Sequence, residues 1–61
     1  MELTRSLIDF LDAHEFGSFD LADIEYISDK VDNYFENFDM QLSIEDSMGL
    51  AEQYSTLKLN K

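Results

Sequence analysis

Residues 20–38 read DLADIEYISDKVDNYFENF, and this stretch decides the fold. An α-helix advances about 100° per residue, and at that step one face collects seven apolar residues: Leu21, Ile24, Ile27, Val31, Tyr34, Phe35 and Phe38. The spacing predicts an amphipathic helix over residues 20–38. Asp20 is a good N-cap, Asp23 adds favourable negative charge to the first turn, and Phe19 and Ile24 have the spacing of a hydrophobic staple.

A second helix is predicted before this stretch, over residues 3–15. Its apolar face comprises Leu3, Leu7, Phe10 and Leu11. We expect Thr4 or Ser6 to cap its start, and Gly17 to take the left-handed conformation that often follows a helix C-terminus.

A third helix is predicted over residues 44–57. Ser43 and Asp46 resemble a capping box, with Asp in place of Glu. The apolar face is less regular and aligns Ile44, Met48, Ala51 and Tyr54. Gly49, inside this helix, costs about 1 kcal/mol relative to Ala.

These patterns predict an all-α fold, a small three-helix domain whose second helix is the longest. Short connections favour antiparallel neighbours. The alternative is two helices plus a short strand pair from residues 40–44 and 56–59, because Met40, Leu42 and Ile44 alternate with polar residues.

Composition agrees with one small helical domain spanning residues 1–61. The chain has no proline, no cysteine and two glycines, and 44% of its residues are hydrophobic, which is too apolar for a disordered acidic tail. It has no signal peptide core and no apolar run long enough for a membrane span. Since it also begins with Met, we expect a complete, soluble, cytoplasmic protein of a bacterial or phage-infected cell.

Charge is the strongest departure from an ordinary domain. The chain holds 14 acidic and 4 basic residues, for a net charge of −10. Nucleic acids and anionic membranes bind basic surfaces, so direct contact with either is not expected. A basic protein would instead be attracted.

The acidic residues include a row that we call the acidic stripe: Glu25, Asp29, Asp32 and Glu36. They lie three or four residues apart on the predicted second helix, so each neighbouring pair of like charges costs roughly 0.2–0.5 kcal/mol. Glu36 and Asp39 also lie near the helix C-terminus, where the dipole disfavours anions. The stripe is either a solvated face or a binding surface.

Four residues outside the stripe are candidates for additional partner contacts. Tyr26 projects away from the apolar face of the second helix, where an exposed Tyr is either an interface anchor or simply a surface aromatic. Asp9, Asp12 and Asp39 would add charge contacts beside the stripe.

The inventory for catalysis is small, and we expect no enzyme activity and no cofactor. A Ser–His–Asp set would need Ser18, His14 and Asp20, whose spacing has no specificity. His14 is better explained as a residue near a helix C-terminus whose ring covers the core edge. The carboxylates follow neither an EF-hand nor another metal-binding order.

In size, acidity and lack of catalytic residues, the chain resembles small acidic inhibitors encoded by bacteriophages and mobile elements. These include anti-CRISPR proteins, anti-restriction proteins and other nucleic-acid mimics. The resemblance concerns overall character, so it assigns no residue roles. It implies a non-enzymatic inhibitor whose partner is a basic nucleic-acid-binding protein, such as a nuclease, a restriction or CRISPR effector, a helicase or a polymerase.

A second hypothesis is a small helical interaction module that acts through apolar surface, as an adaptor, an antitoxin-like partner or a homodimer. Its basis is the apolar residues outside the cleanest helix faces: Ile8, Leu50, Leu57 and Leu59.

Overall fold

The computed structural model describes residues 2–16, 19 and 21–60, without the side chain of Leu21. Three helices make up this part of the chain: α1 (Arg5–Asp12), α2 (Leu21–Glu36) and α3 (Ile44–Leu59). The prediction of an all-α, three-helix domain is confirmed. The strand-pair alternative is wrong, because residues 56–59 belong to α3 and the described residues form no strand.

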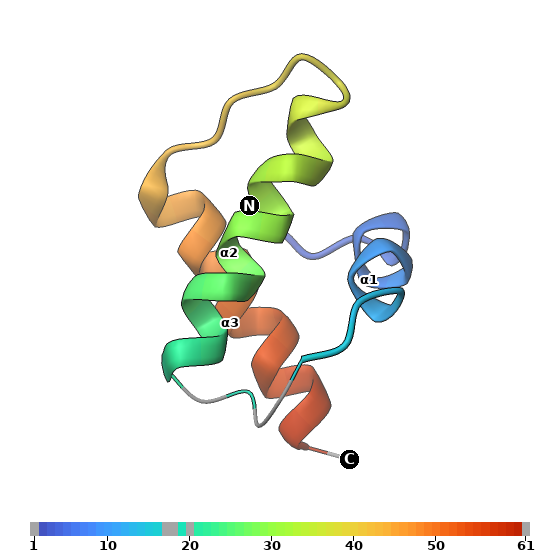
Figure 1. The fold of residues 1–61 in the computed structure, drawn as a ribbon, viewed down its shortest axis with the longest axis vertical. Helices are drawn as coiled ribbons and strands as arrows, with labels where there is room; N and C mark the ends of the chain where they lie inside the picture. The colour runs from blue at the N-terminus through green and yellow to red at the C-terminus, as the bar shows by residue number, and fades with distance from the viewer. Residues whose placement is uncertain (1, 17–18, 20, 61) are drawn as a thin grey trace.

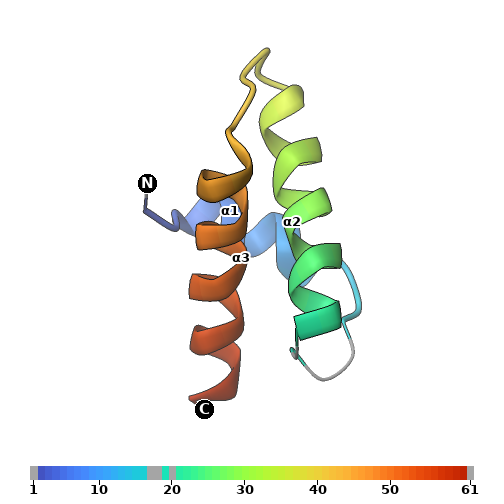
Figure 2. The same cartoon turned by 90° about the vertical axis from the view of Figure 1, so that its left-hand side faces the viewer.

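The three helices do not share one direction. α2 and α3 lie side by side and antiparallel, joined by the connection at the top of Figure 1. α1 lies across this pair, which Figures 1 and 2 show from two sides. The expected antiparallel neighbours are therefore α2 and α3. None of the helices formed by the described residues is long and apolar enough to cross a membrane.

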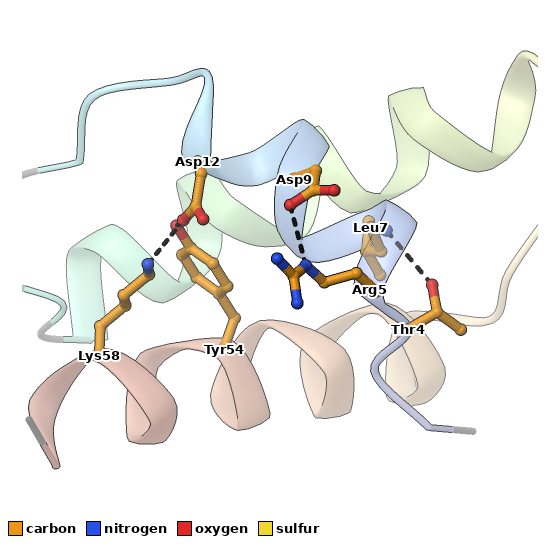
Figure 3. Close-up of polar contacts among 7 residues, drawn as sticks. All are labelled: Thr4, Arg5, Leu7, Asp9, Asp12, Tyr54 and Lys58. Atoms are coloured by element: carbon orange, nitrogen blue, oxygen red, sulfur yellow. Dashed lines mark hydrogen bonds and ion pairs between the residues drawn. The ribbon is translucent and has the colours of Figure 1, made fainter.

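α1 is shorter than the predicted range of residues 3–15, since it begins at Arg5, two residues later, and ends three residues earlier than expected. Thr4 is the N-cap, and its hydroxyl accepts a hydrogen bond from the Leu7 N–H at 3.2 Å (Figure 3). The helix ends at Asp12. In a continued helix, Phe16 would lie about 140° around the axis from buried Leu11. Leaving the helix lets the Phe16 ring pack edge-on against Tyr54, with centroids 5.9 Å apart. The expected role of Gly17 falls outside the described residues.

The beginning of α2 is only partly described, since Asp20 and its expected N-cap role fall outside the described residues. Asp23 lies in the first turn as expected, and its carboxylate accepts a hydrogen bond from the Phe19 N–H at 2.9 Å. Phe19 and Ile24, the predicted staple pair, are both half-buried against the core. Phe19 has a φ of 61°, a left-handed conformation that is unusual for an aromatic residue.

α2 ends at Glu36 rather than residue 38, because the chain makes a Schellman turn. The Asp39 N–H donates to the Glu36 carbonyl and the Met40 N–H donates to the Phe35 carbonyl, both at 3.0 Å. Asp39, with a φ of 58°, is the left-handed residue that this turn requires. Helices that end in this turn usually have Gly at this position, so the sequence contains no obvious signal for the turn.

α3 is longer than expected. Ser43 is its N-cap, as predicted, and accepts a hydrogen bond from the Asp46 N–H at 3.2 Å. The helix continues to Leu59, two residues past the predicted end, and Lys58 in its last turn pairs with Asp12 of α1. The expectation that the second helix is longest is therefore wrong, since α2 and α3 each have 16 residues.

The buried face of α3 also differs from the expected one. Its members follow the i, i+3, i+4, i+7, i+8 spacing of an amphipathic helix: Ser47, Leu50, Ala51, Tyr54 and Ser55. Of the residues expected on this face, Ala51 and Tyr54 are buried and Met48 is half-buried. Ile44, the first residue of α3, is 82% exposed.

The core lies between the three helices. Its fully buried members are Leu7 and Leu11 from α1, Ile27 and Val31 from α2, and Leu50, Ala51 and Tyr54 from α3. The pairing of α2 with α3 also buries a polar contact, in which the Ser28 hydroxyl donates to that of Ser47 at 3.1 Å. Ser47 in turn donates to the Ile44 carbonyl, so this polar pair is satisfied inside the interface.

Gly49 offers the simplest test of the fold. A Cβ added at this position would meet no atom within 4 Å, and its φ is not positive. We therefore expect Gly49→Ala to raise the free energy of unfolding by about 1 kcal/mol, which corresponds to a melting temperature about 4–8 °C higher in a domain of this size. Thermal unfolding followed by circular dichroism measures the shift. A lower melting temperature would contradict the position of Gly49 in α3.

Candidate partner-binding surface

The acidic stripe forms a row on α2. Glu25, Asp29 and Glu36 are exposed, and Asp32 is half-buried. Neighbouring members are one helical turn apart, roughly 5–6 Å. From Glu25 to Glu36 the row spans about 16 Å at 1.5 Å rise per residue.

No stripe carboxylate is used by the fold in the part of the chain that the structure describes. The ion pairs found there are Arg5–Asp9, at 3.3 Å, and Lys58–Asp12, at 2.7 Å. The third described base, Lys30, places its Nζ 5.2 Å from the centre of the Tyr26 ring. The described bases therefore pack or pair elsewhere, and the charge of the stripe is left uncompensated within the described chain.

Asp9 and Asp12 do not join the stripe. Both lie on α1, which contacts α2 through the rings of Phe10 and Tyr34, with centroids 5.2 Å apart. At about 100° per residue, every stripe position lies roughly 140–180° around the α2 axis from Tyr34. α1 and the stripe are thus on opposite sides of α2. Asp9 is an exposed partner of Arg5 on its own helix (Figure 3).

Asp12 has a structural role that the sequence did not reveal. One of its carboxylate oxygens accepts a hydrogen bond from the Tyr54 hydroxyl and pairs with the Lys58 ammonium, each at 2.7 Å (Figure 3). Burial raises the pKa of the Tyr54 phenol, and the hydrogen bond and the charge of Asp12 raise it further. The contact holds α1 against α3, so Asp12 is engaged inside the protein.

Tyr26 is partly explained by the fold. It is 45% exposed. Its ring packs edge-on against Phe16, with centroids 5.4 Å apart, and Lys30 lies beside it. The Phe16 contact fixes one side of Tyr26, while almost half of its surface faces outward.

Asp39 lies on the same end of α2 as Glu36. It is exposed and sits at the C-terminus of the helix, in the left-handed conformation of the Schellman turn. Two local preferences are broken here, because the dipole disfavours an anion at a helix C-terminus and Gly is preferred in that conformation.

The structure adds a feature that sequence reasoning missed. A hollow of about 110 Å³ lies beside the C-terminal half of the stripe, and its lining residues are Asp32, Glu36, Met40, Gln41 and Leu42. The available signal was the alternation of apolar residues at 40, 42 and 44, which indicated a possible strand. That alternation instead accompanies a connection that folds back along α2.

His14, the residue on which a catalytic hypothesis would depend, is engaged by its neighbours. Its Nδ1–H donates to the Phe10 carbonyl at 3.1 Å, and its ring lies 5.0 Å from that of Phe10. Ser18 and Asp20, the other members of that set, fall outside the described residues. Among the described residues, no three His, Asp or Glu side chains are grouped so that they could hold a metal ion.

Comparison with known proteins adds no further constraint. The chain matches no protein-family model, no curated protein and no solved structure at a significant level.

The Tyr54–Asp12 contact predicts how stability depends on pH. Because the folded pKa of Tyr54 is raised, the unfolded chain releases this proton first, near pH 10. The contribution of this contact to the free energy of unfolding is fully present below that pH. It is lost as pH rises above it, by up to about 1.4 kcal/mol per pH unit. Urea unfolding between about pH 8 and pH 11 should show a steeper loss for the wild type than for Tyr54→Phe, which cannot ionise. Equal slopes would contradict a raised pKa.

Asp39 provides a second test. Asp39→Asn removes the unfavourable charge and keeps a residue that tolerates the left-handed conformation, so we expect unfolding to cost about 0.3–1 kcal/mol more. Glu52→Gln, an exposed change of equal charge inside α3, serves as the control. Chemical denaturation of both variants measures the difference. An equal increase in the free energy of unfolding for both variants would mean that stability responds to net charge alone and not to the position of Asp39.

Proposed function

We propose that this protein is a non-enzymatic inhibitor that binds a basic nucleic-acid-handling protein through the acidic face of α2, by mimicking nucleic acid. The partner is a nuclease, a restriction or CRISPR effector, a helicase or a polymerase in the cytoplasm of a bacterial or phage-infected cell. The observation that carries the proposal is the uncompensated stripe, since the fold uses the described bases elsewhere and gains nothing visible from the row.

The spacing of the stripe supports mimicry. Carboxylates one turn apart on a rigid helix have a separation of the same order as successive phosphates along a strand. A groove lined by Lys and Arg for nucleic acid would accept such a row and form charge-assisted hydrogen bonds with it. The net charge of −10 would also steer a basic partner toward the protein.

The test is capture of partners by tagged protein from a bacterial lysate at low and high salt, with and without added DNA or RNA. We expect a nucleic-acid-binding protein to be recovered at low salt and displaced by nucleic acid. Its affinity should fall about tenfold or more between roughly 0.05 and 0.3 M salt, because several screened charges make the contact.

A charge-reversal variant gives the sharper result. Asp29→Lys with Glu36→Lys alters two exposed stripe residues and should abolish capture. Glu15→Lys with Glu52→Lys makes the same change of net charge at exposed positions off α2 and should retain it. If the stripe variant captures the partner normally while remaining folded, the proposal is wrong.

The second candidate function is an interaction module or homodimer that uses apolar surface. Of its residues, Leu50 is fully buried and Ile8 half-buried, whereas Leu57 and Leu59 at the end of α3 are 42% and 62% exposed. This exposure favours a contact near the α3 C-terminus. A dimer in sedimentation equilibrium that persists at high salt would support this candidate over the first.

A further inference from the structure

Three large apolar side chains are exposed on or next to the segment that joins α2 to α3. Phe38, Met40 and Ile44 are 60%, 45% and 82% exposed, and the Phe38 ring lies against Tyr34 with centroids 5.3 Å apart. In a chain this short, leaving three large apolar side chains outside the core forgoes stabilisation that burial would provide. Exposed apolar surface rimmed by polar groups often marks a contact with another protein.

The Schellman turn at the end of α2 forms one side of the hollow described above. It reverses the chain at Asp39, and the connection then runs back past the last turns of α2. As a result, Met40, Gln41 and Leu42 face Asp32 and Glu36 across the hollow. The two carboxylates are one helical turn apart, so one wall is anionic, while the other carries the apolar side chains of Met40 and Leu42 on either side of the polar Gln41.

The size of the hollow limits what it could hold. Sites for cofactors and metabolites are usually about 300–1,000 Å³, and this one is about 110 Å³. It suits the end of a single long side chain. A Lys or Arg side chain matches both walls, because its alkyl stem packs on apolar groups while its charged head pairs with carboxylates.

Charge determines which kind of protein could cover this surface. Residues 31–57 contain six acids and no base: Asp32, Glu36, Asp39, Glu45, Asp46 and Glu52. A second copy of this chain is a poor match, since it carries the same net charge of −10 and its described bases are already placed. The complement is a basic segment that also has an apolar side chain.

We propose that the end of the α2–α3 pair binds a basic peptide segment of the partner, with one Arg or Lys side chain in the hollow between Asp32 and Glu36 and an adjacent apolar side chain against Met40 and, further along the chain, Ile44. The inference rests on the proposed function in taking the partner to be basic. It goes further by making recognition depend on the C-terminal half of the stripe and on apolar contact.

The probe is a capped amphipathic peptide of Arg and Leu, titrated into isotope-labelled protein and followed by NMR. We expect amide shifts at residues 32, 36 and 38–44, and little change in α1. A matched peptide with Ser in place of Leu should bind several-fold more weakly at the same salt, because it lacks the apolar contact. A Lys counterpart distinguishes an Arg site from a general cation site.

Two pairs of variants compare the C-terminal half of the stripe with carboxylates elsewhere on the surface. Asp32→Asn with Glu36→Gln should weaken peptide binding about tenfold, the loss of one charge-assisted contact. Glu15→Gln with Glu52→Gln changes net charge equally at exposed positions off α2 and should leave affinity within about twofold, as distant screened charges do. Equal weakening by both pairs would overturn this inference, yet it would leave the proposed function intact.

The apolar part has its own control. Ile44→Ser and Leu59→Ser replace exposed residues at the first and last positions of α3. We expect Ile44→Ser alone to weaken binding of the Arg and Leu peptide, with thermal unfolding confirming that both variants are folded. Unchanged binding by Ile44→Ser, or peptide-induced shifts that spare residues 38–44, would also overturn the inference. Loss of the proposed function would instead appear as failure to capture a nucleic-acid-binding protein.

Discussion

The hydrogen bond between Tyr54 and Asp12 is the contact on which the arrangement of the three helices depends. α1 has 8 residues, too few for an isolated helix to be stable in water. It is held across the α2–α3 pair because Tyr54, fully buried, reaches Asp12 from α3 while its ring packs on Phe16 and Phe19 of the connection. The hydroxyl needs a partner once it is buried, and a carboxylate is a strong acceptor. Lys58 balances the charge of that carboxylate, so the site tolerates an acid beside the core.

The use of Lys58 beside Tyr54 leaves fewer bases for the rest of the surface. The chain has few bases, and the fold uses Lys58 beside Tyr54, Arg5 beside Asp9 and Lys30 against the Tyr26 ring. Nothing basic is left in residues 31–57 to interrupt the acids of α2 and α3. The carboxylates of the stripe therefore repel one another locally, and together they create a negative electrostatic potential that extends beyond the surface. A protein of this size has little stability in reserve, which makes an uncompensated row on its central helix costly unless another molecule uses it.

Sequence alone predicted the elements but not all of their faces and ends. The period of apolar residues in α2 is regular, and Thr4 and Ser43 cap their helices as their side-chain chemistry suggests. The buried face of α3 was misjudged because Ser47 and Ser55 occupy two of its positions, and hydroxyls that become buried look polar in a pattern. The hollow was missed because its turn uses Asp39 where Gly would have announced a left-handed residue. Asp12 was taken for surface charge because its partners, Tyr54 and Lys58, lie more than forty residues away.

The position of Asp39 argues that the acidic surface is more than a device for solubility. Charge that serves solubility can lie anywhere on the surface, including helix N-termini, where anions stabilise the helix. At residue 39 an Asn would suit the left-handed turn and relieve the helix dipole. The acid instead lies one residue from each of Phe38 and Met40, whose side chains remain exposed. Several local preferences are broken together at this end of the molecule, beside exposed apolar side chains. This supports the proposed binding surface, because selection for stability alone would favour residues that obey those preferences.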